Sequence, residues 1–534
     1  MVSAQSWWQD AVVYQVYPRS YADSDGDGEG DLGGITARLG QIADQGFDAI
    51  WLSPFYPSPM HDSGYDVADY CGIDPRFGTL ADFDALVAAA TSHQLRVIVD
   101  IVPNHCSSEH PLFQAALAAG PGSPERDLFI FRDEPNNWPS FFGGPAWTQV
   151  PDGQYYLHLF DSTQPDWNWR NPAVPAMFED VLRFWLDRGA AGFRVDVGNA
   201  LYKAEGLPDL PEDVLAVPIE QGRRGTPYQD QPELDDHYRS WRAILDSYPL
   251  DGFPGQRIMV GETWADDPSV TARWIKIGMH QSFDFRLIGK TWDAELWQAT
   301  IASAYSDGVP AGAAPWAIGN HDVPRLVTRL GIDQVHHLDQ VREMLLAGDP
   351  EVDLVRGTAR ARAAALVVLG LPGSSYVFQG DELGLPEYVE IPAADRQDPV
   401  FFRTQGESIG RDGCRVPLPW SGTQPPYSFS TSDRTWLPQP PDWGHLTFDA
   451  QRADPASTYT LYREALSQRR RITGDLTWLS LGDQVLAYRR GRDFLCFANF
   501  GDDPVALPAH DSALVTAQVS DGKLAGNSAA WLWV

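Results

Sequence analysis

The chain has 534 residues, of which 43% are hydrophobic and 21% charged, and this composition excludes a disordered or fibrous protein. Asp and Glu number 72 against 40 Lys and Arg, which gives a formal net charge of −32 at pH 7. Because so acidic a chain repels phosphate backbones and anionic lipid, we expect no nucleic-acid partner and no membrane partner.

The cysteines and the start of the chain suggest a compartment. The four cysteines have no CxxC or zinc spacing, so we expect reduced thiols. The first residues lack a basic region followed by an apolar run, and no apolar stretch approaches the roughly 18 residues of a membrane helix. We therefore expect a cytoplasmic monomer or homodimer, although a secreted chain without its leader would look the same.

Apolar runs rich in β-branched and aromatic residues alternate with helical patterns. Several runs are almost continuously apolar, as strands buried on both faces require. A helix is predicted over 174–188, where Val174, Phe178, Val181 and Trp185 share one face, and another from Thr358. The predicted strands cover residues 12–17, 47–54, 95–102, 192–197, 257–262, 282–285, 315–320 and 374–382.

This alternation predicts an α/β protein built on a (β/α)8 TIM barrel. A doubly wound open sheet is the alternative, but no GxGxxG follows the first strand. Two intervals, 105–170 and 383–455, are too long for simple connections between a strand and a helix. Near residue 460 a helix is followed by short strands with turns between them. We predict a catalytic barrel over 1–104 and 171–455, with an insertion at 383–455 after the eighth strand. An inserted subdomain over 105–170 and a C-terminal antiparallel β domain over 456–534 complete the chain.

Candidate catalytic groups follow the predicted strands, where a barrel carries its active site. Arg194 and Asp196 are two residues apart and project to one side, so we expect Arg194 to hold Asp196 ionised as a nucleophile. Glu262 lies between apolar Val260 and Trp264, which favours a protonated general acid. Such a pair, about 5–5.5 Å apart, suits glycoside cleavage with retention. Any one of these acids alone could be a cap or a surface charge.

Short motifs in order resemble the α-amylase superfamily of glycoside hydrolases (glycoside hydrolase family 13). They are DIVPNH at 100–105, GFRVDV at 192–197, ETW at 262–264 and GNHD at 319–322, with support from GDLGGI, GYDV and GDELGL. The resemblance implies Asp196 as nucleophile, Glu262 as acid/base and Asp322 as transition-state stabiliser. It also implies a stacking platform at Tyr65 and a sugar held in the −1 subsite by Asp66, His105, Arg194 and His321.

Two further segments resemble the oligo-1,6-glucosidase and α-glucosidase subgroup. QPDWNW at 164–169 is similar to its QPDLN signature, with Trp167 in place of Leu. RDGCRVPLPW at 411–420 is similar to RDxxRTPMxW, which implies that Arg415 reaches the substrate, while Val416 and Leu418 depart from the pattern. The subgroup is exo-acting, and Val197 after the nucleophile indicates α-1,6 or mixed α-1,6/α-1,4 substrates.

The functional hypothesis is an exo-acting, retaining α-glucosidase that takes a small neutral α-glucoside and releases glucose from its non-reducing end. The double displacement would pass through a covalent glucosyl-Asp196 intermediate. A glucosyltransferase or a sucrose- or trehalose-converting enzyme would use the same residues. An inactive barrel serving as a binding or transport accessory protein is a third interpretation, which the presence of all three catalytic acids disfavours.

The acidic run at 23–31 is a candidate cation site. Its opening is similar to an EF-hand loop, but position 12 is Gly34 rather than Glu, so an EF-hand is rejected. The resemblance implies a structural Ca²⁺, or Mg²⁺, held by Asp23, Asp25, Asp27 and Asp31 with the backbone carbonyl of Glu29. A solvated acidic turn is the alternative.

Other conspicuous residues are interpreted as structural. We expect Cys106 to be a packed small residue and His336 and His337 to lie on the surface. We expect four tryptophans near the termini to serve packing: Trp7, Trp8, Trp531 and Trp533.

Overall fold

The structure is a computed structural model that describes residues 6–217, 225–264, 267–305, 308–310, 312–333, 338–349 and 351–534. Eight parallel strands form its centre, in the order β10-β11-β1-β2-β3-β7-β8-β9. A parallel bridge between Asp284 and Trp316 joins the chain after β9 to β10 and closes the sheet into a barrel. The predicted TIM barrel is confirmed.

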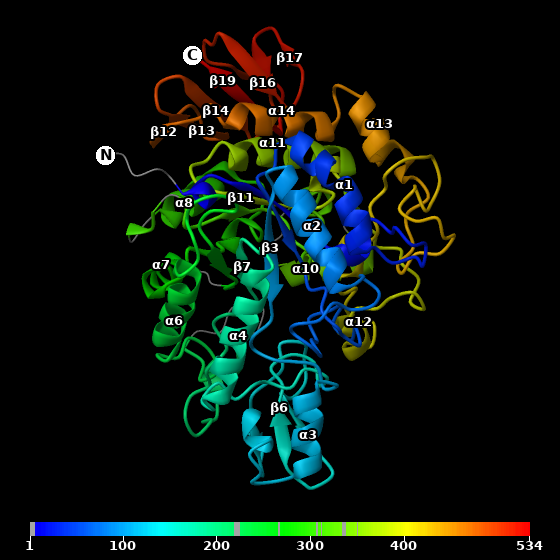
Figure 1. The fold of residues 1–534 in the computed structure, drawn as a ribbon. Helices are drawn as coiled ribbons and strands as arrows, with labels where there is room; N and C mark the ends of the chain where they lie inside the picture. Colours follow the sequence, from blue (N-terminus) through cyan, green and yellow to red (C-terminus); the bar gives the residue numbers. More distant parts are fainter. Residues whose placement is uncertain are drawn as a thin grey trace.

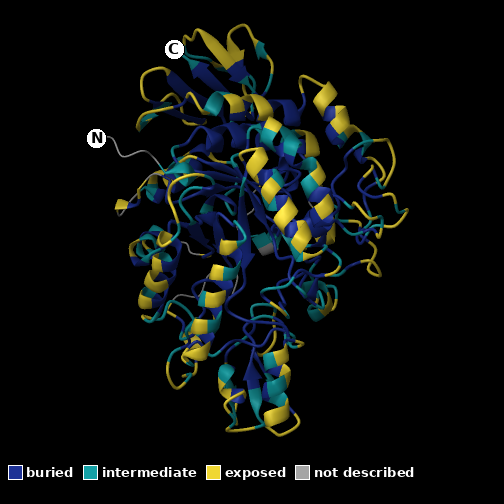
Figure 2. Cartoon of the chain, viewed as in Figure 1, coloured by how far each residue is buried: buried dark blue, intermediate teal, exposed yellow. Residues whose placement is uncertain are grey.

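Each predicted apolar run supplies one of these strands, although the observed strands are shorter. Their residues are almost all buried (Figure 2). In such a barrel helices cover the outside and side chains fill the centre. The strands are β1 Val12–Val16, β2 Ala49–Leu52, β3 Arg96–Ile101, β7 Gly192–Val195, β8 Ile258–Gly261, β9 Gln281–Ser282, β10 Trp316–Ala317 and β11 Ser375–Phe378.

The helices alternate with the strands along the chain. In α4 the predicted stripe faces the core, since Val174, Phe178, Val181 and Trp185 are all buried. The longer helices are α1 Leu32–Gln45, α2 Leu80–Ser92, α4 Ala173–Asp187, α6 Leu234–Asp246, α7 Pro268–Ile277, α8 Ala294–Ala304, α10 Leu338–Ala347 and α11 Leu354–Leu369. The short ones are α5 Glu212–Leu215, α9 Leu326–Leu330, α12 Pro399–Arg403 and α13 Phe448–Ala453.

The segment between β3 and α4 forms a small unit at the end of the barrel toward which the strands point (Figure 1). It contains α3 (Pro111–Ala119) and an antiparallel sheet in the order β4-β6-β5. Its strands are β4 Phe131–Arg132, β5 Trp147–Gln149 and β6 Tyr155–Leu157. This position puts the insertion beside the strand ends, where the candidate catalytic residues lie.

At the opposite end, α14 (Thr458–Arg469) and antiparallel sheets pack against α11 (Figure 1). The larger sheet has the order β12-β13-β14-β19-β16, and its contact with the barrel includes indole and phenol hydrogen bonds to α11. The strands are β12 Leu476–Leu479, β13 Val485–Arg490, β14 Phe494–Asn499, β15 Val505–Ala506, β16 Ser512–Val515, β17 Val519–Ser520, β18 Lys523–Leu524 and β19 Ser528–Trp533.

Cys106 is fully buried, as a packed residue should be, and the Trp531 indole donates to Leu366 O at 2.8 Å. His336 and His337 lie outside the described residues. Within the described ranges, the helices are all too short or too polar to cross a membrane.

Trp531→Ala should weaken the packing of the C-terminal sheet against α11. The change leaves a large cavity and removes the indole hydrogen bond to Leu366 O, so we expect a loss of about 3–5 kcal/mol in stability. Thermal unfolding measures the effect, and Leu481→Ala, at a residue that is 43% exposed, is the control. Equal unfolding midpoints for the two variants would show that the contact of Trp531 with α11 does not contribute to stability.

Candidate active site

The buried guanidinium of Arg194, in β7, lies at the centre of the candidate site. Its Nη1 is 2.6 Å from Asp196 Oδ1 and 3.0 Å from Asp100 Oδ1. Its Nη2 is 2.7 Å from Glu262 Oε2, which follows β8. Parallel pairing sets Asp100 of β3 opposite Arg194, so acids from three neighbouring strands converge on one guanidinium.

Asp196 shares its arginine with two other acids. Burial raises the pKa of Asp196 well above its usual range; Arg194 opposes this effect, while the charges of Glu262 and Asp100 add to it. Burial also raises the pKa of Asp100 to about 7. Because three buried carboxyls share the one positive charge of Arg194, we infer that the cluster holds one proton when no substrate is bound. The predicted pairing of Arg194 with Asp196 is present, and the ionised state of Asp196 stays a prediction.

The surroundings of Glu262 are more polar than the sequence indicates. Oε2 accepts hydrogen bonds from Arg194 and from the backbone N–H of Val197 at 3.1 Å, and Oε1 accepts from Trp264 Nε1 at 3.1 Å. Val197 reaches Glu262 with a φ of 43°, a left-handed conformation that a β-branched residue rarely adopts. The expected apolar pocket between Val260 and Trp264 is therefore wrong: N–H donors surround the carboxyl.

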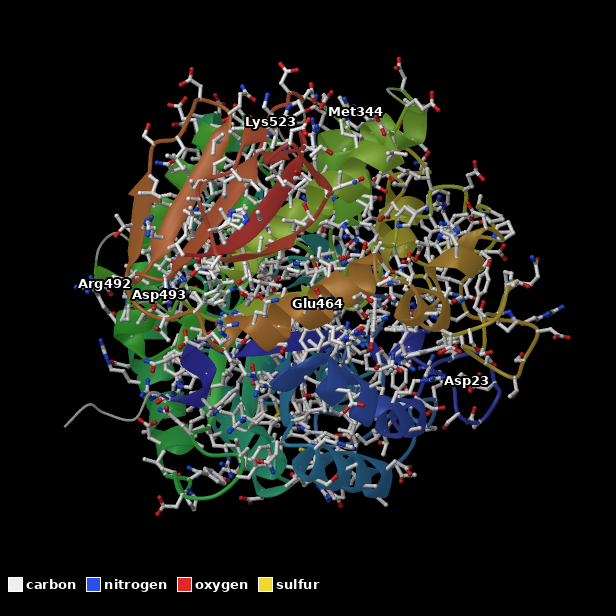
Figure 3. All side chains as sticks on the ribbon, turned by 90° about the horizontal axis from the view of Figure 1, so that it is seen from above. Asp23, Met344, Glu464, Arg492, Asp493 and Lys523 are labelled. Atoms are coloured by element: carbon white, nitrogen blue, oxygen red, sulfur yellow. The ribbon has the colours of Figure 1, made fainter. Side chains whose placement is uncertain are left out.

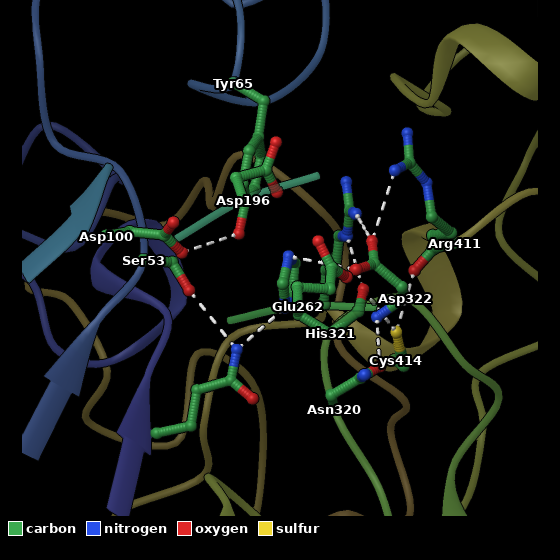
Figure 4. Close-up of polar contacts among 12 residues, drawn as sticks. Ser53, Tyr65, Asp100, Asp196, Glu262, Asn320, His321, Asp322, Arg411 and Cys414 are labelled. Atoms are coloured by element: carbon green, nitrogen blue, oxygen red, sulfur yellow. Dashed lines mark hydrogen bonds and ion pairs between the residues drawn. The ribbon is translucent and has the colours of Figure 1, made fainter. Parts of the chain in front are cut away.

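Asp322, after β10, is held by positive charge and by a histidine (Figure 4). Its Oδ1 lies 2.9 Å from Arg415 Nη2 and 3.2 Å from Arg411 Nη1, and its Oδ2 lies 3.3 Å from His321 Nε2. Burial opposes ionisation, but His321, Arg411 and Arg415 outweigh it and lower the pKa of Asp322. Asp322 is therefore a fixed negative charge beside the Arg194 cluster.

Tyr65 links the two groups of acids. Its ring stacks on His321 at 5.2 Å with an interplanar angle of 5°, and its hydroxyl donates to Asp100 Oδ2 at 3.0 Å. Gln15 Nε2 donates to Nδ1 of His321, and burial keeps the pKa of His321 well below its usual range. Neutral His321 therefore has its Nε2 proton available for Asp322.

The other predicted sugar-binding residues lie around this centre. His105 contacts Asn104 and Gln164 through its two ring nitrogens, and burial, with help from the charge of Lys203, lowers its pKa to about 3. Asp66 is fully buried, and its carboxylate accepts from Ser58 Oγ and from two backbone N–H groups. The structure places Asp66 beneath the loop that carries Asp62, rather than in the cluster.

Sequence reasoning missed Asp62, Asp100, Asp398 and the role of Arg411. Arg411 Nη2 is 2.6 Å from Asp62 Oδ1, and its Nε is 2.6 Å from Asp398 Oδ2. The motif RDGCRVPLPW contains both Arg411 and Arg415, but only Arg415 was predicted to act in the site. Asp100 is the first residue of the motif DIVPNH, and its place on a strand next to that of Arg194 was the signal that could have identified it.

The acidic loop lies outside the barrel mouth, with Asp23 at the outer edge of the molecule (Figure 3). Carboxylate oxygens of Asp23, Asp25 and Asp27 lie within 4.8 Å of one another. Asp31 instead caps α1, because its oxygens accept from Gly34 N, Ser24 N and Ser24 Oγ. The Glu29 carboxylate pairs with Arg19, which is compatible with a role for its backbone carbonyl alone.

Buried carboxyls at neighbouring strand ends of a TIM barrel define a glycosidase type of site. A profile of the family described as alpha amylase, catalytic domain, matches residues 15–474. The chain therefore belongs to the α-amylase family and is a glycoside hydrolase of that family.

Known relatives cover nearly the whole chain. A probable alpha-glucosidase of Rhizobium meliloti (strain 1021) is 35% identical over 528 residues, covering 93% of this chain and 90% of that protein. The glucan 1,6-alpha-glucosidase of Streptococcus pneumoniae serotype 4 is 33% identical, covering 93% of this chain and 92% of that protein.

Solved structures agree with the fold over 99% of this chain. The alpha-glucosyl transfer enzyme XgtA superposes with a TM-score of 0.84 at 34% identity and is covered in full. The trehalulose synthase MutB of Pseudomonas mesoacidophila MX-45 gives a TM-score of 0.83 at 30% identity, with 99% of its chain covered.

Arg411→Ala should weaken catalysis through Asp322. Loss of the guanidinium raises the pKa of Asp322, so the acid limb of the pH–rate profile should move to higher pH. We expect kcat/KM for the enzyme's glycoside to fall about a hundredfold. Arg188→Ala is the control, since Arg188 pairs with Asp84 rather than with Asp322. An unmoved acid limb would refute this electrostatic role.

Proposed function

We propose that the protein is an exo-acting, retaining α-glucosidase that releases glucose from the non-reducing end of short α-1,6- or α-1,4-glucosides. The observation that carries this proposal is the pair Asp196 and Glu262, whose carboxyls contact Nη1 and Nη2 of the same guanidinium, Arg194, at 2.6 and 2.7 Å. Two carboxyls held by one guanidinium suit retention, which needs about 5–5.5 Å between them, better than inversion, which needs about 6.5–9.5 Å.

The two acids exchange roles around one shared proton. A glucoside bound between them separates the carboxyls, so that the proton stays on Glu262 and Asp196 remains ionised beside Arg194. Asp196 then attacks the anomeric carbon, while Glu262 protonates the leaving oxygen. Glu262 later takes a proton from the incoming water, and Asp322 stabilises the positive charge that develops in the sugar.

The exo mode of action is inferred from the ion pairs on the side of the site beyond Asp322. Arg411 bridges Asp322, Asp62 and Asp398, and the Arg403–Asp161 ion pair joins α12 to the inserted segment. These buried and half-buried bridges fit a wall that admits only a chain end. The prediction of α-1,6 or mixed linkage specificity from Val197 stays part of this proposal.

A glucosyltransferase or a sucrose-converting enzyme is the second candidate. It is favoured by the similarity to XgtA, described as an alpha-glucosyl transfer enzyme, and to the trehalulose synthase MutB. A covalent glucosyl-enzyme passes its sugar to water or to another sugar, and access to the site decides which. Product analysis at high substrate concentration separates the candidates: glucose alone supports hydrolysis, and oligosaccharides or sucrose isomers support transfer.

Asp196→Asn should abolish glucose release, with a fall of at least about a thousandfold in kcat, because amides are poor nucleophiles. Asp284→Asn, a buried acid at a neighbouring strand end that pairs with Arg286, is the matched control and should keep activity. Proton NMR of the first product formed by the parent chain should show α-glucose. β-Glucose as the first product, or an active Asp196→Asn, would contradict the mechanism.

We also propose a structural Ca²⁺, or Mg²⁺, at the acidic loop. Partial burial raises the pKa of Asp27, and the neighbouring charges of Asp25 and Asp23 add to this, so a cation would relieve their repulsion. Gly28, at φ +99°, packs so tightly that a Cβ would lie 2.4 Å from Arg434 O, which holds the loop in place. Asp31 would join the ligands only by giving up its cap.

Chelation should therefore lower thermal stability. A site that is filled at a hundred times its Kd contributes about 2.7 kcal/mol, which corresponds to a shift of a few degrees in Tm. Adding Ca²⁺ back should restore Tm in the parent chain but not in an Asp25→Asn/Asp27→Asn variant. Identical Tm values with chelator and with Ca²⁺ would exclude a structural ion.

For partners and location, we propose a monomer or homodimer that acts on neutral glucosides in the cytoplasm, without nucleic-acid or membrane partners. The strongly acidic charge supports the absence of polyanionic partners. The four cysteines, Cys71, Cys106, Cys414 and Cys496, are all free, as is usual in a reducing compartment.

A further inference from the structure

Trp264 is unusual among the large residues of the site. It lies two positions after Glu262, and 46% of its surface is exposed, whereas Glu262 itself is 5% exposed. One part of the indole packs on Phe285, with ring centroids 4.6 Å apart, and Nε1 donates to Glu262 Oε1. An exposed side chain with its polar atom directed inward is well placed to act on that carboxyl.

The two oxygens of Glu262 have different partners. Oε2 accepts from Arg194 Nη2 at 2.7 Å and from Val197 N at 3.1 Å, so N–H groups already occupy it. Among the described residues, Trp264 Nε1 is the donor to Oε1, at 3.1 Å. A proton on Oε2 would face two N–H donors, so the proton that the leaving group receives belongs on Oε1.

The charged groups that act on Glu262 come from two strands. Arg194 and Asp196 belong to β7 and its end, and Asp100 belongs to β3. Phe285, on the 3-10 helix after β9, contributes an uncharged ring. Trp264 is therefore a neutral donor to the carboxyl, and it can be removed without changing the charge of the site.

We propose that Trp264 is a positioning residue for the acid/base: its indole N–H fixes the direction of Glu262 Oε1. This inference rests on the proposed function. Removing the N–H lets the carboxyl turn, so proton delivery to the leaving oxygen should suffer.

Trp264→Phe tests the proposal, because it keeps an aromatic ring on Phe285 and removes only the N–H. We expect kcat to fall about fivefold for isomaltose, whose leaving group needs a proton, which is the effect of one hydrogen bond. For p-nitrophenyl α-glucoside, whose leaving group needs no proton, we expect kcat to change much less.

Two further variants serve as controls. Trp8→Phe also removes an indole hydrogen bond to a side chain, Gln256 Oε1 at 3.0 Å, but on another element, so both kcat values should match those of the parent. Phe285→Leu removes the ring beneath Trp264 and keeps the N–H, so the ratio of the two kcat values should stay close to that of the parent.

The outcomes separate this inference from the proposed function. A parent chain that cleaves neither substrate overturns the proposed function, and the role of Trp264 falls with it. With an active parent, the role of Trp264 alone is overturned if Trp264→Phe leaves both kcat values unchanged, or if kcat falls equally for both substrates.

Discussion

The sharing of one buried guanidinium by three carboxyls is the interaction on which the rest of the site depends. Arg194 can hold Asp100, Asp196 and Glu262 together only because β3, β7 and β8 are neighbours in a parallel barrel. Its single charge cannot balance three negative charges in a buried place, so the cluster keeps a proton. Glycoside cleavage needs such a proton between two carboxyls, because one acts as an acid and the other as a nucleophile.

At Asp322 the arrangement is reversed, because two arginines act on one acid. Arg411 and Arg415 both contact Asp322, which keeps this acid ionised, and Tyr65 lies between it and the Arg194 cluster. The two groups give neighbouring acids different protonation states in one pocket. Most of the other acids of this chain lie outside the pocket, and they account for its net charge of −32.

The sequence was sufficient for the barrel, because continuous apolar runs and amphipathic helices are local patterns that burial enforces. It was also sufficient for the strand-end positions of Asp196, Glu262 and Asp322. It was insufficient for protonation, since the pairing of Asp100 with Arg194 depends on the register between two strands. Asp62 and Arg411 are 349 positions apart, so only the fold brings them together. Asp31 caps α1, as an acid just before a helix often does, so its role as a metal ligand stays a prediction that requires it to leave the cap.

The covalent bond between Asp196 and the sugar is the step that most directly tests the mechanism. A fluorinated glucosyl fluoride that forms the intermediate quickly and hydrolyses slowly would trap it, and mass spectrometry of a peptic digest would locate the label. We predict one added sugar per chain, on the peptide that contains Asp196. An inactivated enzyme with the label on another residue, or turnover without any covalent adduct, would contradict the account.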